Sequence, residues 1–164
     1  DELKKEYSLN KKELTEVLIE KLKERYKISE HEIKEIIKKE KDIPVTIFVK
    51  KLGALESVCK YMKENLNLSY TEIAKLLNRN ERTIWTAYKK AKEKQSEQLE
   101  IKETQIFLPI STFKDRKLTV LESVITYLKE KGMKHKDIAK LLERDQRNIG
   151  TIYSRAVKKI KRKI

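Results

Sequence analysis

The sequence of 164 residues is poor in glycine, proline and cysteine, and each shortage narrows the folds open to it. Three glycines and two prolines suit helices joined by short connections and argue against an all-β fold. The single cysteine, Cys59, cannot form an internal disulfide, so a reducing compartment fits the chain. Cys59 falls at a helical spacing that favours burial over a reactive thiol.

The chain also lacks an apolar run long enough for a membrane span and a signal-peptide core at its start. We therefore expect a cytoplasmic protein with no membrane partner. It shows no Ser-His-Asp set, glycine-rich phosphate loop or paired catalytic carboxylates, so we expect neither an enzyme nor a cofactor. His31 and His135 lie far apart without a Cys/His cluster, which argues against a metal site. A start at Asp1 leaves open whether residues precede it.

Charge is abundant and unevenly distributed. Lys and Arg number 40 against 26 Asp and Glu, for a net charge of +14. Residues 1–42 hold 12 of each sign, and residues 95–107 hold 1 basic and 3 acidic residues. Residues 43–94 hold 11 basic and 5 acidic residues, and residues 108–164 hold 16 and 6. The positive excess thus lies in two separate stretches, which favours a polyanionic partner.

The two basic stretches are copies of each other. Residues 55–58 recur unchanged at 121–124, and residues 73–77 recur unchanged at 138–142. Each copy opens with a proline that is followed four residues later by a phenylalanine, Phe48 or Phe113. We expect an extended arm or short turn at these two places, with the phenylalanine packed under the helices, rather than a paired strand.

Apolar spacing and capping residues predict three helices in each copy. In the first copy they cover residues 52–65, a short helix opened by a Ser69–Glu72 capping box, and a last helix capped by Asn80. In the second copy they cover residues 119–131, a helix from Lys134 whose cap is lost, and a last helix capped by Asp145. The predicted fold class is therefore all-α.

We divide the chain into an N-terminal helical pair at 1–42, the first copy at 43–94, a linker at 95–107 and the second copy at 108–164. The linker has no glycine or proline, so it is able to extend the preceding helix. The N-terminal pair is predicted at residues 10–26 and 29–41, with an apolar stripe formed by Leu14, Val17, Leu18, Leu22 and Tyr26. These apolar side chains need another element or another chain to pack against. A homodimer contact or docking element and a plain structural cap both stay open.

The sequence pattern of the last two helices is specific enough to compare with known families. Glu72-Ile73-Ala74-x-x-Leu77, a polar turn and then Arg82-Thr83-Ile84 resemble the helix-turn-helix of sigma-factor region four and of LuxR-type regulators. With the proline–phenylalanine lead-in, the chain resembles small archaeal and bacterial transcription regulators, including activators of the archaellum operon. The resemblance implies tandem helix-turn-helix units that bind double-stranded promoter or operator DNA.

In such a unit, the second helix enters the major groove with its N-terminal residues on base edges. The candidate base-reading residues are Glu81, Arg82, Trp85, Thr86, Gln146, Arg147, Gly150 and Thr151. The candidate phosphate contacts are Tyr70, Arg79, Lys89, Lys90, His135, Arg144, Ser154, Arg155, Lys158 and Lys159. Arg82 and Arg147 are the strongest candidates for base contact, because arginine can donate two hydrogen bonds to guanine O6 and N7. Phosphate binding, or pairing with a nearby glutamate, is the alternative for both.

The two copies differ at their contact faces, since Trp85 is replaced by Gly150. Trp85 lies at the edge of the face, and both thymine contact and partial burial stay open for it. Gly150 fits either a close approach to DNA or a tolerated weak position. We expect an asymmetric site of two subsites about 34 Å apart. An adaptor, with one unit on DNA and the other on the transcription machinery, is the second hypothesis; RNA binding is a weaker third.

Overall fold

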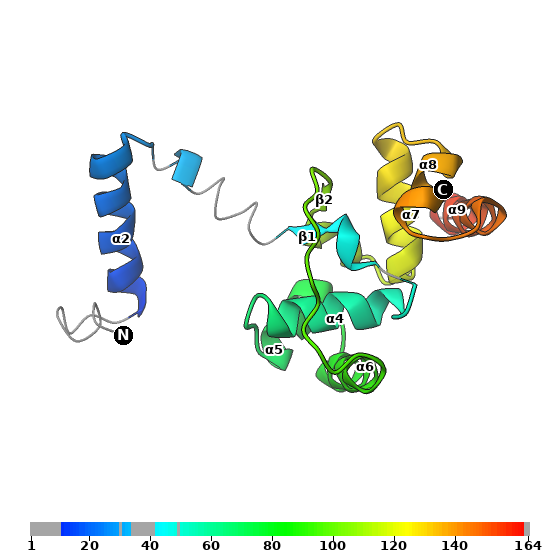
Figure 1. The fold of residues 1–164 in the computed structure, drawn as a ribbon, viewed down its shortest axis with the longest axis horizontal. Helices are drawn as coiled ribbons and strands as arrows, with labels where there is room; N and C mark the ends of the chain where they lie inside the picture. Colours follow the sequence, from blue (N-terminus) through cyan, green and yellow to red (C-terminus); the bar gives the residue numbers. More distant parts are fainter. Residues whose placement is uncertain (1–10, 30, 34–41, 49, 163–164) are drawn as a thin grey trace. The chain divides into compact units, whose positions relative to one another are not determined.

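The computed structural model describes residues 11–29, 31–33, 42–48 and 50–162, and divides the chain into the units Asp1–Lys41 and Asp42–Ile164. The described residues are mostly helical, as predicted (Figure 1). In the first unit, helix α2 spans Lys11–Tyr26, within the predicted range 10–26, of which residue 10 lies outside the described residues. Leu18, Leu22 and Tyr26 of its apolar stripe are 40%, 40% and 59% exposed. The other predicted helix lies mostly outside the described residues.

The second unit contains the two sequence copies in order. The first copy comprises β1 (Ile43–Pro44), the 3-10 turn η1 (Val45–Ile47), α4 (Ala54–Glu64), α5 (Tyr70–Leu77) and α6 (Glu81–Lys94). The second comprises β2 (Phe107–Leu108), η2 (Ile110–Phe113), α7 (Val120–Glu130), α8 (His135–Leu141) and α9 (Gln146–Lys161). In each copy the first helix packs on the third, and the second packs beside them (Figure 1). Within the described ranges, no helix is long and apolar enough to cross a membrane.

Local capping chemistry explains where these helices begin. The predicted capping box is confirmed at Ser69, whose hydroxyl accepts from the Glu72 amide. A second capping box opens α7, where the Thr119 hydroxyl accepts from the Glu122 amide. The same motif is present in the first unit, where the Glu32 amide donates to Ser29 Oγ at 3.2 Å. Lys134 makes no side-chain cap bond, as expected for the second copy.

The two proline segments pair with each other. β1 and β2 run antiparallel, with Ile43 opposite Leu108 and Pro44 opposite Phe107. Our expectation of unpaired arms is therefore wrong. Each strand supplies two residues, which is too short for the alternation of apolar and polar residues that identifies a strand in sequence.

The connection between the copies, residues 95–106, does not continue α6. Gln95 already has an extended backbone, with φ of −147° and ψ of 99°. Gln98 Nε2 donates to Glu64 O at 3.1 Å, Asn65 Nδ2 donates to Leu99 O at 3.4 Å, and Leu99 is buried. The predicted helical extension is thus corrected to an extended segment that packs on the C-terminal end of α4.

Residues from both copies contribute to one apolar core. The fully buried residues of this core include Val58, Met62, Ile84, Val124 and Ile149. Phe48 and Phe113 are buried as well, and their ring centroids lie 6.2 Å apart. The burial predicted for Cys59 is confirmed, and desolvation raises the pKa of its thiol to about 12.

An ion pair of α4 joins a fully buried cation to a partly exposed carboxylate at the edge of this core. Lys60 is fully buried, and its ammonium donates to both carboxylate oxygens of Glu64, at 2.8 and 2.7 Å. Glu64 also accepts from the Tyr88 hydroxyl at 3.1 Å. Partial burial raises the pKa of Glu64, but the hydrogen bonds and charge of Lys60 outweigh this and hold that pKa below its usual value. The second copy carries Thr126 in place of Lys60.

Candidate nucleic-acid interface

The first turn of α6 and of α9 is fixed by a side-chain cap. Asn80 Oδ1 accepts from the Arg82 amide at 2.8 Å. Asp145 Oδ1 accepts from the Arg147 amide at 2.8 Å and from the Asn148 amide at 3.2 Å. Each cap satisfies backbone donors that a helix start leaves free, and so determines which residue comes first. Arg82 and Arg147 consequently occupy the same position, second in their helices.

Core contacts set the rotation of these helices. Ile84 and Ala91 of α6 are fully buried, as are Ile149 and Ala156 of α9. With 3.6 residues per turn, the residues two before each isoleucine must then lie on a different face. Arg82 and Arg147 are accordingly exposed. Neither guanidinium makes a hydrogen bond or ion pair with any described residue. The alternative that each pairs with a glutamate of its own chain is not supported there.

The neighbouring candidates are more engaged. Glu81 is exposed and accepts from the Thr71 hydroxyl at 2.9 Å. Its counterpart Gln146 is exposed as well. The hydroxyls of Thr86 and Thr151 donate to the carbonyls of Arg82 and Arg147, at 2.8 and 3.0 Å. With their hydroxyl protons used inside the helix, both threonines offer chiefly a methyl group, which suits contact with a thymine methyl.

The position that distinguishes the two copies is on the surface in both. Trp85 is 47% exposed, and Lys89 Nζ lies 5.3 Å from its ring centroid. Its ring is therefore largely outside the core. At Gly150, an added Cβ would meet only His135 Nδ1, at 3.9 Å, which is ordinary van der Waals contact. Packing within the protein does not require glycine at this position.

The candidate phosphate contacts fall into three groups. Five are exposed: Lys89, Lys90, Ser154, Arg155 and Lys158. Three others are occupied within the fold. Lys159 Nζ lies 2.7 Å from Glu122 Oε2, while the rings of Tyr70 and His135 pack on Tyr88 and Tyr153, with centroids 5.8 and 5.7 Å apart. The structure thus gives these three residues internal partners that sequence reasoning did not assign.

The last two candidates, Arg79 and Arg144, occupy equivalent turns. Both are half-buried, and the Nε atom of each is buried without a hydrogen-bond partner among the described residues. Burial lowers the pKa of Arg79, and the nearby charge of Arg116 lowers it further. Arg79 and Arg116 line an open groove of about 420 Å³ beside the turn. Sequence reasoning missed Arg116, and its signal was the charged run at residues 114–117.

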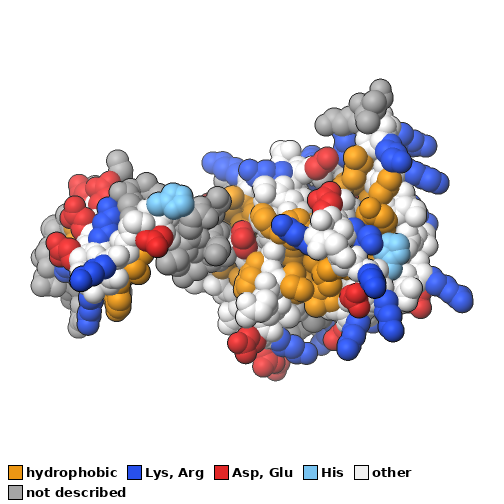
Figure 2. Space-filling model, turned by 90° about the horizontal axis from the view of Figure 1, so that it is seen from above, with side chains coloured by type: hydrophobic (Ala, Val, Ile, Leu, Met, Phe, Trp, Pro, Cys, Tyr) orange, Lys and Arg blue, Asp and Glu red, His pale blue; other side chains and the backbone are white. Residues whose placement is uncertain are grey.

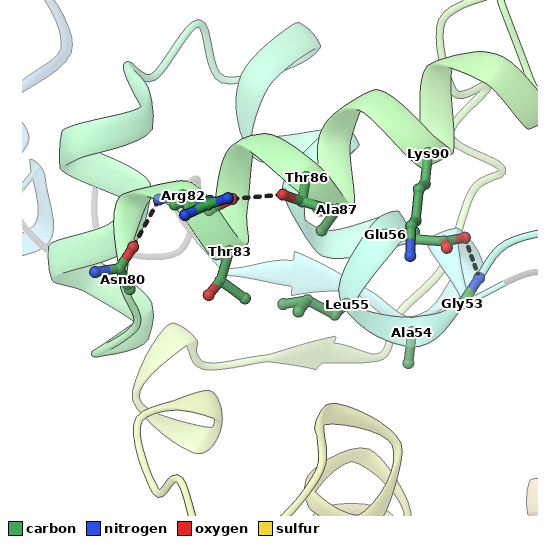
Figure 3. A pocket seen from close by; sticks show the side chains of 10 residues that line it. All are labelled: Gly53, Ala54, Leu55, Glu56, Asn80, Arg82, Thr83, Thr86, Ala87 and Lys90. Carbon is green, nitrogen blue, oxygen red and sulfur yellow. Dashed lines mark hydrogen bonds between the residues drawn. The ribbon is translucent and has the colours of Figure 1, made fainter.

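A larger groove runs along α6 in the first copy (Figure 3). It measures about 570 Å³ and lies between the start of α4, residues 53–56, and the outer side of α6. Arg82, Thr83, Thr86 and Lys90 line its α6 side, so two cations border it. Thr83, a further residue that sequence reasoning left out of the site, is exposed here. Figure 2 shows further Lys and Arg side chains projecting from the second unit.

Comparisons with known proteins add no identity to this arrangement. No family model matches the chain, and neither a search of curated proteins nor one of solved structures finds a match. The described residues contain no group of three or more His, Cys, Asp or Glu side chains that could hold a metal ion. The interface is therefore defined by its cationic and polar side chains alone.

Proposed function

We propose that this protein is a sequence-specific, double-stranded DNA-binding transcription regulator. In this proposal α5–α6 and α8–α9 are tandem helix-turn-helix units, and α6 and α9 read adjacent major grooves. The observation that carries it is repeated: Arg82 and Arg147 stand exposed in the first turn of equivalent helices, without a carboxylate partner among the described residues. A surface guanidinium in that place is suited to bidentate donation to guanine.

Charge supplies the affinity in this proposal. Six cations among the phosphate candidates form no ion pair in the described part of the chain: Arg79, Lys89, Lys90, Arg144, Arg155 and Lys158. Of these, Lys90 lies near enough to Glu56 for its charge to lower the pKa of that carboxyl group. If each contacts a phosphate, the logarithm of the binding constant falls against the logarithm of salt concentration with a slope of about −5. Phosphate contacts position a protein without reading sequence, whereas base contacts specify it.

The test is a set of duplex titrations at several salt concentrations, on DNA selected by the full chain from a random pool. Arg82→Ala and Arg147→Ala should each cost about 1–3 kcal/mol on that duplex and much less on random DNA. Lys92→Ala is the matched control, because Lys92 is a cation of the same helix that already pairs with Glu64. It should leave the sequence preference unchanged. Salt-independent binding, or equal weakening by the arginine variants on all sequences, contradicts base reading.

A second candidate is the adaptor, in which only one unit binds DNA. The unequal surface positions favour it, since Trp85 presents an aromatic ring where Gly150 presents backbone. In that case one arginine variant loses affinity for the selected duplex and the other does not. The apolar stripe of α2 also stays a predicted homodimer or docking contact, with Leu22 and Tyr26 exposed.

A further inference from the structure

The two copies meet through equivalent residues. Ile43 and Leu108 hold the same place in the repeat, because each directly precedes the proline of its copy. These two residues lie opposite each other in the antiparallel β1–β2 pair. When equivalent residues of two antiparallel segments pair with each other, a local two-fold axis passes between them. The same signature identifies the self-complementary interface of a symmetric dimer.

Other contacts obey the same axis. Phe48 and Phe113, each four residues after its proline, face each other with centroids 6.2 Å apart. The equivalent helices α4 and α7 also contact one another. In Figure 1, α6 lies along one side of α4 and α9 along the outer side of α7, and both are seen nearly end-on. The second unit is thus built as an internal pseudo-dimer of its two copies.

The symmetry is approximate, since α5 packs against η2 whereas the equivalent helix α8 packs less closely against η1. Asn78 Nδ2 of the first copy donates to Lys114 O of the second copy at 3.4 Å. The residue equivalent to Asn78 is Glu143, which has no side-chain amide to repeat this bond. By contrast, the ion pair that joins the first and third helices is kept, since Glu56–Lys94 recurs as Glu122–Lys159, at 2.8 and 2.7 Å.

We propose that the target is an imperfect inverted repeat in duplex DNA, and that one chain covers both half-sites. This inference rests on the proposed function. A two-fold relation between recognition helices is matched by DNA whose half-sites are themselves related by a dyad, about 10–10.5 base pairs from centre to centre. The half-sites share the base pairs that Arg82 and Arg147 contact. They differ where Trp85 faces one and Gly150 faces the other.

The experiment starts from a duplex that the full chain selects from a random pool. Two altered duplexes are then compared with it by fluorescence anisotropy: one with a half-site reversed in place, giving a direct repeat, and one with about five base pairs inserted between the half-sites. Each should bind at least about tenfold more weakly, because one helix loses its base contacts. Native mass spectrometry should give one chain per selected duplex.

A symmetrised variant makes the test sharper. Gln146→Glu with Gly150→Trp gives the second copy the contact residues of the first, and a Cβ at position 150 meets only ordinary van der Waals contact, with His135 Nδ1 at 3.9 Å. This variant should move its preference toward a perfect inverted repeat of the first copy's half-site. A direct repeat as the selected sequence, equal binding of the reversed duplex, or two chains per duplex overturns the inference alone. Failure to enrich any duplex overturns the proposed function, and the inference with it.

Discussion

If the proposed function holds, we expect replacement of Gly150 with alanine to raise stability and to weaken DNA binding. Gly150 is the fifth residue of α9, so it lies in the helix interior, where glycine costs about 1 kcal/mol relative to alanine. The new Cβ would meet only His135 Nδ1, at 3.9 Å, so no packing penalty offsets that gain. We expect the free energy of unfolding to rise by about 1 kcal/mol and the melting temperature by about 4 °C.

Urea denaturation followed by circular dichroism measures the first effect as a higher midpoint at unchanged slope. Gly132→Ala is the matched control. Gly132 has φ of +83°, which strains any side chain, so the same substitution should destabilise there by about 1 kcal/mol. A lower midpoint for Gly150→Ala would refute the packing argument.

The second effect is measured on the selected duplex. Packing within the protein does not require glycine at 150, so we expect the glycine to let the backbone of α9 come close to the DNA. An added methyl group would obstruct that approach. Gly150→Ala should therefore weaken binding to the selected duplex while the protein becomes more stable. Unchanged affinity would refute a close approach of α9 to DNA at this position.

Two further predictions concern the buried and partly buried charges. Glu64→Gln should lower the free energy of unfolding by about 3 kcal/mol, because it leaves the fully buried Lys60 ammonium without its carboxylate partner. Lys60→Met should change the same quantity by about 1 kcal/mol or less. Equal losses for the two variants in urea denaturation would contradict this. Partial burial raises the pKa of Glu122, but hydrogen bonds from Lys159 and Thr119 and the charge of Lys159 outweigh it and hold that pKa below its usual value. Its stabilisation is therefore present above about pH 5 and lost as pH falls through the folded-state pKa, so Glu122→Gln should flatten the acid limb of stability against pH.

Helix positions were largely predictable because their signals are local. Ser69 with Glu72 and Asn80 before Arg82 identify helix starts over two or three residues, and the structure places those caps as expected. The apolar spacing likewise predicted three helices in each copy, and the structure contains them. These features depend on neighbours in the chain, which the sequence displays directly.

Contacts between distant segments were not predictable in the same way. The Ile43–Leu108 pairing joins two-residue strands, and nothing within either strand indicates its partner. Lysine is almost never fully buried unless it is paired, so the sequence alone suggests an exposed side chain at Lys60. The structure buries Lys60 and pairs it with Glu64. Lys159, a predicted phosphate contact, also pairs with Glu122, 37 residues away, which the sequence did not indicate.

A hydroxyl-radical footprint of the full chain on its selected duplex tests the central claim most directly. Two recognition helices in adjacent major grooves should protect two patches on one face of the DNA, about one helical turn apart. Arg82→Ala should weaken one patch and Arg147→Ala the other. A single protected patch that responds to only one of the two arginine variants would contradict the account of two DNA-reading units in one chain.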